Sequence, residues 1–139
     1  MNPRLVVDCS AICALCFDDE ATPESDRLLD QLELGGVWVP GLFLWEVANV
    51  LLSAERRKRI SQAERMEALQ LLTSLDLQLD DTATAVVWHD GIQLARQTGL
   101  TSDDAAYLEL AMRLGTALAT RDRERQRAAL QLGVSLQAC

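Results

Sequence analysis

Short apolar runs that alternate with helix-like segments constrain the fold of this chain more than any other feature. Five such runs lie at residues 4–8, 37–40, 77–79, 117–120 and 134–136. Each is too short for a helix, and apolar runs of this length between turn or capping residues are typical of buried strands. Alternating strands and helices form crossover units, which build a parallel sheet covered by helices on both faces. The sequence therefore predicts a three-layer α/β/α domain with a central, mostly parallel sheet.

The segments between the runs carry the start and stop signals of helices. Ser61 and Glu64 form a Ser-x-x-Glu capping box, Asp81 or Thr82 caps the next predicted helix, and Gly99 ends it. No linker, repeat or low-complexity stretch divides the chain, so we expect a single domain over residues 1–139. The predicted helices cover residues 10–17, 24–33, 42–59, 61–75, 82–97, 102–115 and 122–132.

Charge and hydropathy limit the partners of this domain. The formal net charge is −8. Because nucleic-acid affinity rests on neutralised phosphates, so acidic a chain needs local basic residues or metal ions to hold RNA or DNA. No apolar run is long enough to span a membrane, and Asp8 interrupts the first one, which makes a poor secretory signal. We therefore expect a cytoplasmic protein without a membrane partner.

Four carboxylates fall where a site would form in such a sheet. Asp8 ends the first run and Asp122 follows the fourth, so both lie at the carboxyl edge of the sheet, where functional groups gather. Glu46 and Asp104 lie on helix faces that are otherwise apolar, where an unpaired acid is costly. The only lysine, Lys58, is far from Glu46, and the acids look short of basic partners. Divalent cations that prefer oxygen ligands, Mg²⁺ or Mn²⁺, would relieve the repulsion.

Each acid also has an ordinary structural interpretation. Asp8 alone is typical of a turn, and Asp104 and Asp122 are typical of helix caps or first helical turns. Glu46 has no such local role, because it lies in the middle of an apolar helix. The joint placement of the four acids, rather than any one of them, favours a metal site.

The cysteines suggest a competing thiol chemistry. Cys9, Cys13 and Cys16 recur at helical spacing, which is typical of a buried apolar stripe. Cys13 and Cys16 also spell C-x-x-C, but they fall inside the predicted helix rather than at its start, which disfavours a redox pair. A zinc site would need Cys139 or His89, both distant in sequence, so we expect neither function.

Four stretches of the chain carry a resemblance to a known family. VVDCSAICALCFDDE, WVPGLFLWEVANVLL, LTSDDAAYLELA and ALATRDRERQRAALQLGV, in this order, resemble the PIN-domain ribonucleases and, more narrowly, the VapC-type toxins of toxin–antitoxin pairs. The resemblance implies a Rossmann-like PIN domain with a sheet of about four to five strands. It also implies a catalytic, metal-binding set of Asp8, Glu46, Asp104 and Asp122, which holds Mg²⁺ or Mn²⁺ and cleaves single-stranded or loop RNA.

The same resemblance assigns supporting residues and partners. Ser10 and Thr120 match small hydroxyl positions that bond the acids or bound water, and Asn49 matches a polar partner of the glutamate. Asp103, beside Asp104, is out of register with the motif, and its side chain lies about 100° around the helix. The family also implies a homodimer and inhibition by a small cognate antitoxin, which would form a hetero-oligomer with the toxin.

The proposed reaction is metal-assisted phosphodiester hydrolysis, in which the metal activates and orients water. Basic residues that could contact RNA or antitoxin are Arg56, Arg57, Arg59 and Arg121, although a solvated helix end is the default interpretation of the first three. His89 lies mid-helix and is not expected to be a catalyst.

Three other classes remain to be weighed. A haloacid-dehalogenase-type phosphatase needs a second Asp where this chain has Ser10, and a receiver domain needs a late lysine, whereas the only lysine is Lys58. The remaining alternative is a non-catalytic RNA- or antitoxin-binding module of the same fold.

Overall fold

The predicted apolar runs form the strands of one parallel sheet in a computed structural model, which describes residues 2–139. The strand order is β3-β2-β1-β4-β5, and every neighbouring pair is parallel. The strands are β1 (Leu5–Val7), β2 (Val37–Pro40), β3 (Gln78–Asp80), β4 (Ala117–Ala119) and β5 (Leu136–Gln137). β1 lies at the centre, with β2 and β3 added on one side of it and β4 and β5 on the other. Open α/β sheets bind their ligands at such a switch point in the strand order, here beside β1.

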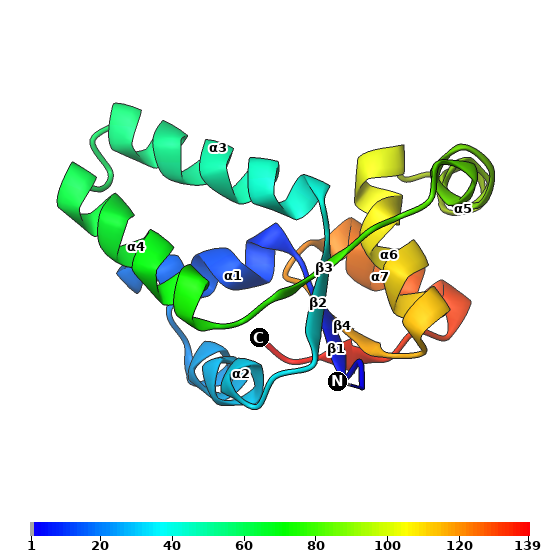
Figure 1. The fold of residues 1–139 in the computed structure, drawn as a ribbon, viewed down its shortest axis with the longest axis horizontal. Coiled ribbons are helices and arrows are strands. Elements are labelled where there is room, and N and C mark those ends of the chain that lie inside the picture. The colour runs from blue at the N-terminus through cyan, green and yellow to red at the C-terminus, as the bar shows by residue number, and fades with distance from the viewer. Residues whose placement is uncertain (1) are drawn as a thin grey trace.

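Helices cover both faces of the sheet, which confirms the predicted three-layer α/β/α arrangement (Figure 1). One layer holds α1 (Cys9–Cys16), α2 (Pro23–Glu33), α3 (Leu42–Arg56) and α4 (Gln62–Ser74), with a 3-10 turn at Asp18–Glu20 between the first two. The other layer holds α5 (Ile92–Thr98), α6 (Ser102–Leu114) and α7 (Arg123–Leu132). Because both faces are covered, the inner strands β1, β2 and β4 carry near-continuous apolar side chains, whereas the edge strands β3 and β5 also carry polar ones.

Two predicted helices end or begin elsewhere. The helix predicted over 42–59 ends at Arg56, because Lys58 adopts a left-handed φ of 60°. The helix predicted over 82–97 enters through a π-helical stretch, Val86–Gly91, with no side-chain cap. The prediction that Asp81 or Thr82 caps this helix is wrong. The Thr82 hydroxyl donates instead to the Asp80 carboxylate at the end of β3.

The core lies where α6 crosses the sheet. Val6, Val7 and Leu118 from the central strands are fully buried, as are Tyr107 and Leu108 from α6. At about 25 cal/mol per Å² of apolar surface removed from water, this packing is the main force that fixes α6, and with it Asp104, beside β1.

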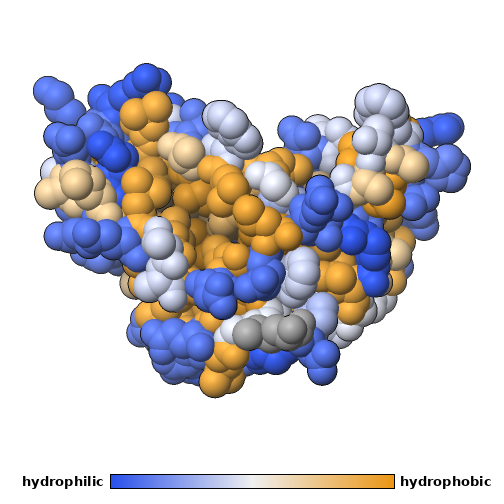
Figure 2. Space-filling view, viewed as in Figure 1, coloured by the Kyte–Doolittle hydropathy of each residue, from blue (hydrophilic) through white to orange (hydrophobic). Residues whose placement is uncertain are grey.

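The surface is hollowed above the carboxyl edge of the sheet, between the lobe of α3 and α4 and the lobe of α5 and α6 (Figure 2). Apolar side chains stay exposed on the α3 lobe: Trp45 is 81% exposed, and Leu44 and Leu52 are also exposed. Within residues 2–139, no helix is both long and apolar enough to cross a membrane.

Candidate active site at the carboxyl edge of the sheet

Asp8 is the centre of the site and is completely buried. It follows β1 and is the N-cap of α1, where its Oδ1 accepts hydrogen bonds from the Ala11 amide at 3.0 Å and the Ser10 hydroxyl at 2.7 Å. Its Oδ2 accepts from the Thr120 hydroxyl and from Nη1 of Arg125, the latter at 2.8 Å. A carboxylate offers about four lone-pair sites, so these partners use its whole capacity.

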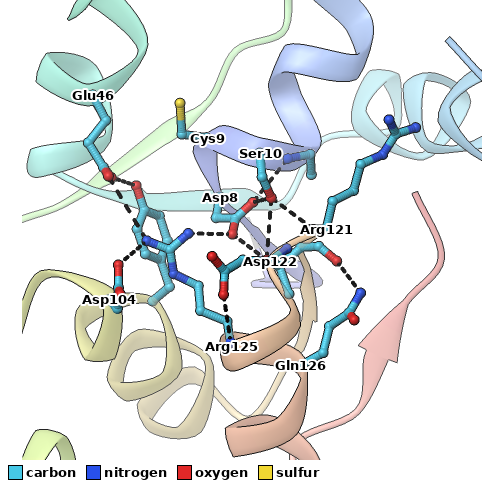
Figure 3. Close-up of polar contacts among 12 residues, drawn as sticks. Asp8, Cys9, Ser10, Glu46, Asp104, Arg121, Asp122, Arg125 and Gln126 are labelled. Atoms are coloured by element: carbon cyan, nitrogen blue, oxygen red, sulfur yellow. Dashed lines mark hydrogen bonds and ion pairs between the residues drawn. The ribbon is translucent and has the colours of Figure 1, made fainter. Parts of the chain in front are cut away.

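Arg125 is the residue that sequence reasoning missed. Its side chain rises from α7, is 7% exposed, and lies among the acids (Figure 3). Nη1 donates to Asp8, Nη2 donates to Asp104 at 2.7 Å, and Nη2 lies 4.0 Å from Oε2 of Glu46. The guanidinium also stacks over the Tyr107 ring, with its central carbon 4.7 Å from the ring centroid. One cation therefore contacts three of the four predicted acids.

This arrangement corrects the expectation that the acids lack a basic partner. The signal was present in the sequence, because Arg125 shares a helical face with Ala128, Ala129 and Leu132 at the spacing i, i+3, i+4 and i+7. Ala128 and Ala129 are fully buried, so this face of α7 points inward and an arginine on it needs a buried anion.

Tyr107, not Asn49, is the polar partner of Glu46. The Tyr107 hydroxyl donates to Oε1 of Glu46, and burial together with this hydrogen bond raises the pKa of Tyr107. Asn49 is exposed and makes no side-chain hydrogen bond with any of residues 2–139. Asn49 therefore does not bond Glu46 in this structure, and its supporting role stays a prediction. Asn49 lies nearly a full helical turn from Glu46, but its side chain points to solvent.

Asp122 joins the site through the loop after β4. It is the N-cap of α7, and its Oδ1 accepts from the Arg125 amide at 2.9 Å. In the same loop, the Asp122 amide donates to the Thr120 hydroxyl at 3.0 Å, and the Arg121 amide donates to the Ser10 hydroxyl at 2.8 Å. The two hydroxyls thus tie the loop after β4 to Asp8. Asp8 and Asp122 are therefore helix caps, as their structural interpretation predicts, and both also lie among the acids at this edge of the sheet (Figure 3).

The acids offer the oxygen ligands that Mg²⁺ and Mn²⁺ prefer, so the donor set fits a divalent ion by type. In this structure, however, the acids are not spaced to coordinate a metal ion together. Among residues 2–139, no three His, Cys, Asp or Glu side chains are grouped closely enough to hold one. In Figure 3 the Arg125 guanidinium lies between Asp8, Glu46 and Asp104.

Two of the four predicted basic contacts are engaged within the chain. Arg59 pairs with Asp19 at 2.7 Å and with Glu20 at 2.8 Å. Arg121 donates to the Glu20 carbonyl at 2.8 Å, and also to Thr22 Oγ1 and the Cys139 carbonyl, which fastens the C-terminus to the start of α2. Arg56 and Arg57 are exposed, and within residues 2–139 neither side chain makes a hydrogen bond or ion pair.

The thiols do not form a second site. Cys9 and Cys13 are buried with their sulfurs 3.8 Å apart, and the hydrogen bond between them raises the pKa of Cys9. Burial raises the pKa of Cys16 to about 11, so it is a protonated thiol at neutral pH. The predicted apolar stripe is confirmed for Cys9 and Cys13. His89 is exposed, and its one side-chain hydrogen-bond partner among residues 2–139 is its neighbour Asp90.

Comparison with known proteins gives matches over most of the chain. A family model described as the PIN domain matches residues 5–130. The chain is 35% identical over 121 residues to Ribonuclease VapC3 of Pyrobaculum aerophilum, a match that covers 87% of this chain and 91% of the relative. A solved structure, "Crystal structure of PAE2754 from Pyrobaculum aerophilum", superposes with a TM-score of 0.72 at 26% identity, covering 98% of this chain and 85% of the other.

Proposed function

The chain belongs to the PIN-domain family, among its VapC-type members, and from this premise we propose that it is a divalent-metal-dependent endoribonuclease that acts as the toxin of a toxin–antitoxin pair. The observation that carries the proposal is the convergence of Asp8, Glu46, Asp104 and Asp122, from four separate elements, at the carboxyl edge of the sheet. The whole of residues 1–139 acts as one domain in this proposal.

The acids would hold Mg²⁺ or Mn²⁺, with Asp8 and Asp104 as the most direct ligands and Glu46 and Asp122 completing the set. A bound divalent ion lowers the pKa of a water ligand and stabilises charge on a scissile phosphate. Asp8 suits its role because Ser10, the Ala11 amide and Thr120 fix both of its oxygens in place. Glu46 is oriented in the same way by Tyr107. No side-chain nucleophile is needed, since water attacks the phosphorus.

Substrate recognition follows from the charge distribution. An acidic protein holds RNA only where cations meet phosphates. Arg56 and Arg57, at the exposed end of α3, are the members of the predicted basic set with no partner among the described residues, so we assign phosphate or antitoxin contact to them before Arg59 and Arg121. A homodimer, a protein antitoxin and a cytoplasmic location complete the proposal, as is general for VapC toxins.

One observation favours a second candidate, a non-catalytic RNA- or antitoxin-binding module. Arg125 already supplies a positive charge to the acids, as a permanent substitute for a metal would. In such a module the cluster would serve stability alone.

The two candidates are separated by RNA cleavage with the purified chain, freed of any antitoxin. We expect a mixed pool of labelled single-stranded RNA to be cut in Mn²⁺ or Mg²⁺ and left intact in chelator. Because water is the nucleophile, an RNA with a single 2′-deoxyribose at the cut site should still be cleaved, and no 2′,3′-cyclic phosphate should form. Absence of cleavage, or equal cleavage in chelator, would reject the enzyme and favour the binding module.

A further inference from the structure

We propose that Arg125 is the resident counter-cation of the acidic cluster and that a divalent ion binds only when the Arg125 side chain leaves it. The proposal rests on the proposed metal-dependent function, which does not itself require any role for this arginine. Arg125 would then be a positioning residue that sets the metal affinity of the site.

The hydrogen bonds of Asp8 show why an exchange is required. Both oxygens of this buried carboxylate have their lone pairs occupied, so a metal ion cannot reach Asp8 until one partner withdraws. The Ala11 amide and the Ser10 hydroxyl belong to the first turn of α1, which Asp8 itself caps. Thr120 is a short side chain, 3% exposed, and its hydroxyl also accepts from the Asp122 amide. Arg125 is the one long side chain among the partners.

The other contacts of Arg125 indicate the direction in which it can leave. Its Nη2 binds Asp104, whose side chain is 36% exposed, and lies near Glu46, whose side chain is 33% exposed. The guanidinium therefore lies between the fully buried Asp8 on one side and the partly exposed Asp104 and Glu46 on the solvent side. Its Nε is buried and has no hydrogen-bond partner among residues 2–139, so the inward position leaves one donor of the guanidinium group without an acceptor.

Charge explains why the inward position is nonetheless occupied. Several carboxylates at close range repel one another, and a buried one without a cation is costly. Arg125 relieves this repulsion in the metal-free chain, and a divalent ion would relieve it more strongly at the same place. The exchange replaces one cation with another, so it leaves no uncompensated acid at either end-point. The apparent metal affinity is then reduced by the fraction of molecules in which Arg125 occupies the cluster.

The test is the affinity of the purified chain for Mn²⁺, measured by titration calorimetry after chelator treatment. The variants are Arg125→Met and, as a control, Arg123→Met, which removes the same charge from the same helix turn. Arg123 is exposed, and its side chain has no hydrogen bond or ion pair with residues 2–139. We expect Arg125→Met to bind Mn²⁺ at least about tenfold more tightly than wild type, and Arg123→Met to stay within about twofold. Unchanged or weaker binding by Arg125→Met would overturn the proposal.

A second measurement does not depend on the folding of any variant. In wild-type protein the Arg125 Nε–H resonance, assigned by NMR, should shift towards that of exposed arginines as diamagnetic Mg²⁺ is added. A resonance that stays unchanged at saturating Mg²⁺ would show that the arginine remains in place, and the inference would fall. If neither wild type nor Arg125→Met binds Mn²⁺ or Mg²⁺, the metal-dependent function falls as well. If the wild type binds metal but the Arg125 resonance does not respond, only the proposed exchange is rejected and the metal-dependent function stands.

Discussion

Replacement of Asp8 by asparagine should destabilise the metal-free protein far more than a typical surface substitution. Asparagine keeps one acceptor oxygen, which suffices for Ser10 and the Ala11 amide. Its amide nitrogen then faces Nη1 of Arg125, so two donors meet where an ion pair stood at 2.8 Å. Thr120 can reverse its hydroxyl and accept, but Arg125 cannot.

The size of the effect follows from the burial of the pair. Asp8 is 0% and Arg125 is 7% exposed as side chains, and breaking a buried pair by removing one partner costs about 3–5 kcal/mol. Arg125 keeps its bond to the partly exposed Asp104, which places the expected loss near the lower end, at about 3 kcal/mol. For a chain of 139 residues this corresponds to a fall in Tm of about 10 °C.

Urea unfolding in chelator measures this loss for Asp8→Asn, Arg125→Met and the double variant. Because each single change strands the other partner, the two losses should not add. We expect the double variant to be more stable than the sum predicts by about 2 kcal/mol. The reasoning is refuted if Asp8→Asn loses less than about 1 kcal/mol, or if the losses add within error.

Three further perturbations test other parts of the structure. Tyr107→Phe removes the donor to Glu46 and should lower the free energy of unfolding by about 1–2 kcal/mol. It should also slow RNA cleavage in single-turnover assays, and an unchanged cleavage rate would show that the reaction does not need Tyr107 to orient Glu46. Arg113, which donates to both oxygens of Asp80, lowers the pKa of that carboxyl, so the stabilisation is present above the unfolded pKa of about 4 and is lost as pH falls through the folded value. The difference in urea stability between wild type and Asp80→Asn should therefore be largest near neutral pH and shrink in acid, and a difference that grows in acid would contradict the assignment. Gly36→Ala should lower the free energy of unfolding by at least about 2 kcal/mol, because φ is +72° and the added carbon would lie 2.7 Å from a backbone oxygen, whereas Gly115→Ala, at φ +66° with open space, should lose only about 1 kcal/mol in the same denaturation assay.

The sheet could be predicted from the sequence because its signals are local. Apolar runs of three to five residues between capping residues correspond to every strand, and each strand end was located within about two residues. The edge at which Asp8 and Asp122 meet then follows from parallel topology alone. The start of the helical segment that ends in α5 could not be predicted in the same way. This segment includes the π-helical stretch Val86–Gly91, which has no side-chain cap and which no local rule anticipates.

The contacts inside the site depend on side chains that meet across the fold. Arg125 reaches Asp8, 117 residues away in sequence, and Tyr107 reaches Glu46, 61 residues away. Helical spacing puts Tyr107 on the face of Asp104, and the spacing of Arg125 with Ala128 and Ala129 is the signal that was overlooked, but neither pattern says which long side chain reaches which acid. The family resemblance assigned Asn49 to Glu46, and in this structure a tyrosine hydroxyl from another helix bonds that carboxylate.

The most direct measurement compares RNA cleavage by two neighbouring variants, Asp104→Asn and Asp103→Asn, in saturating Mn²⁺. Both remove one carboxylate from the first turn of α6, but Asp104 lies in the cluster with Arg125, whereas Asp103 is exposed and bonds no side chain among residues 2–139. We expect Asp104→Asn to reduce the cleavage rate at least about a hundredfold and Asp103→Asn to stay within about twofold of wild type. Equal rates for the two variants, or a larger loss in Asp103→Asn, would contradict a metal-dependent site built on this cluster.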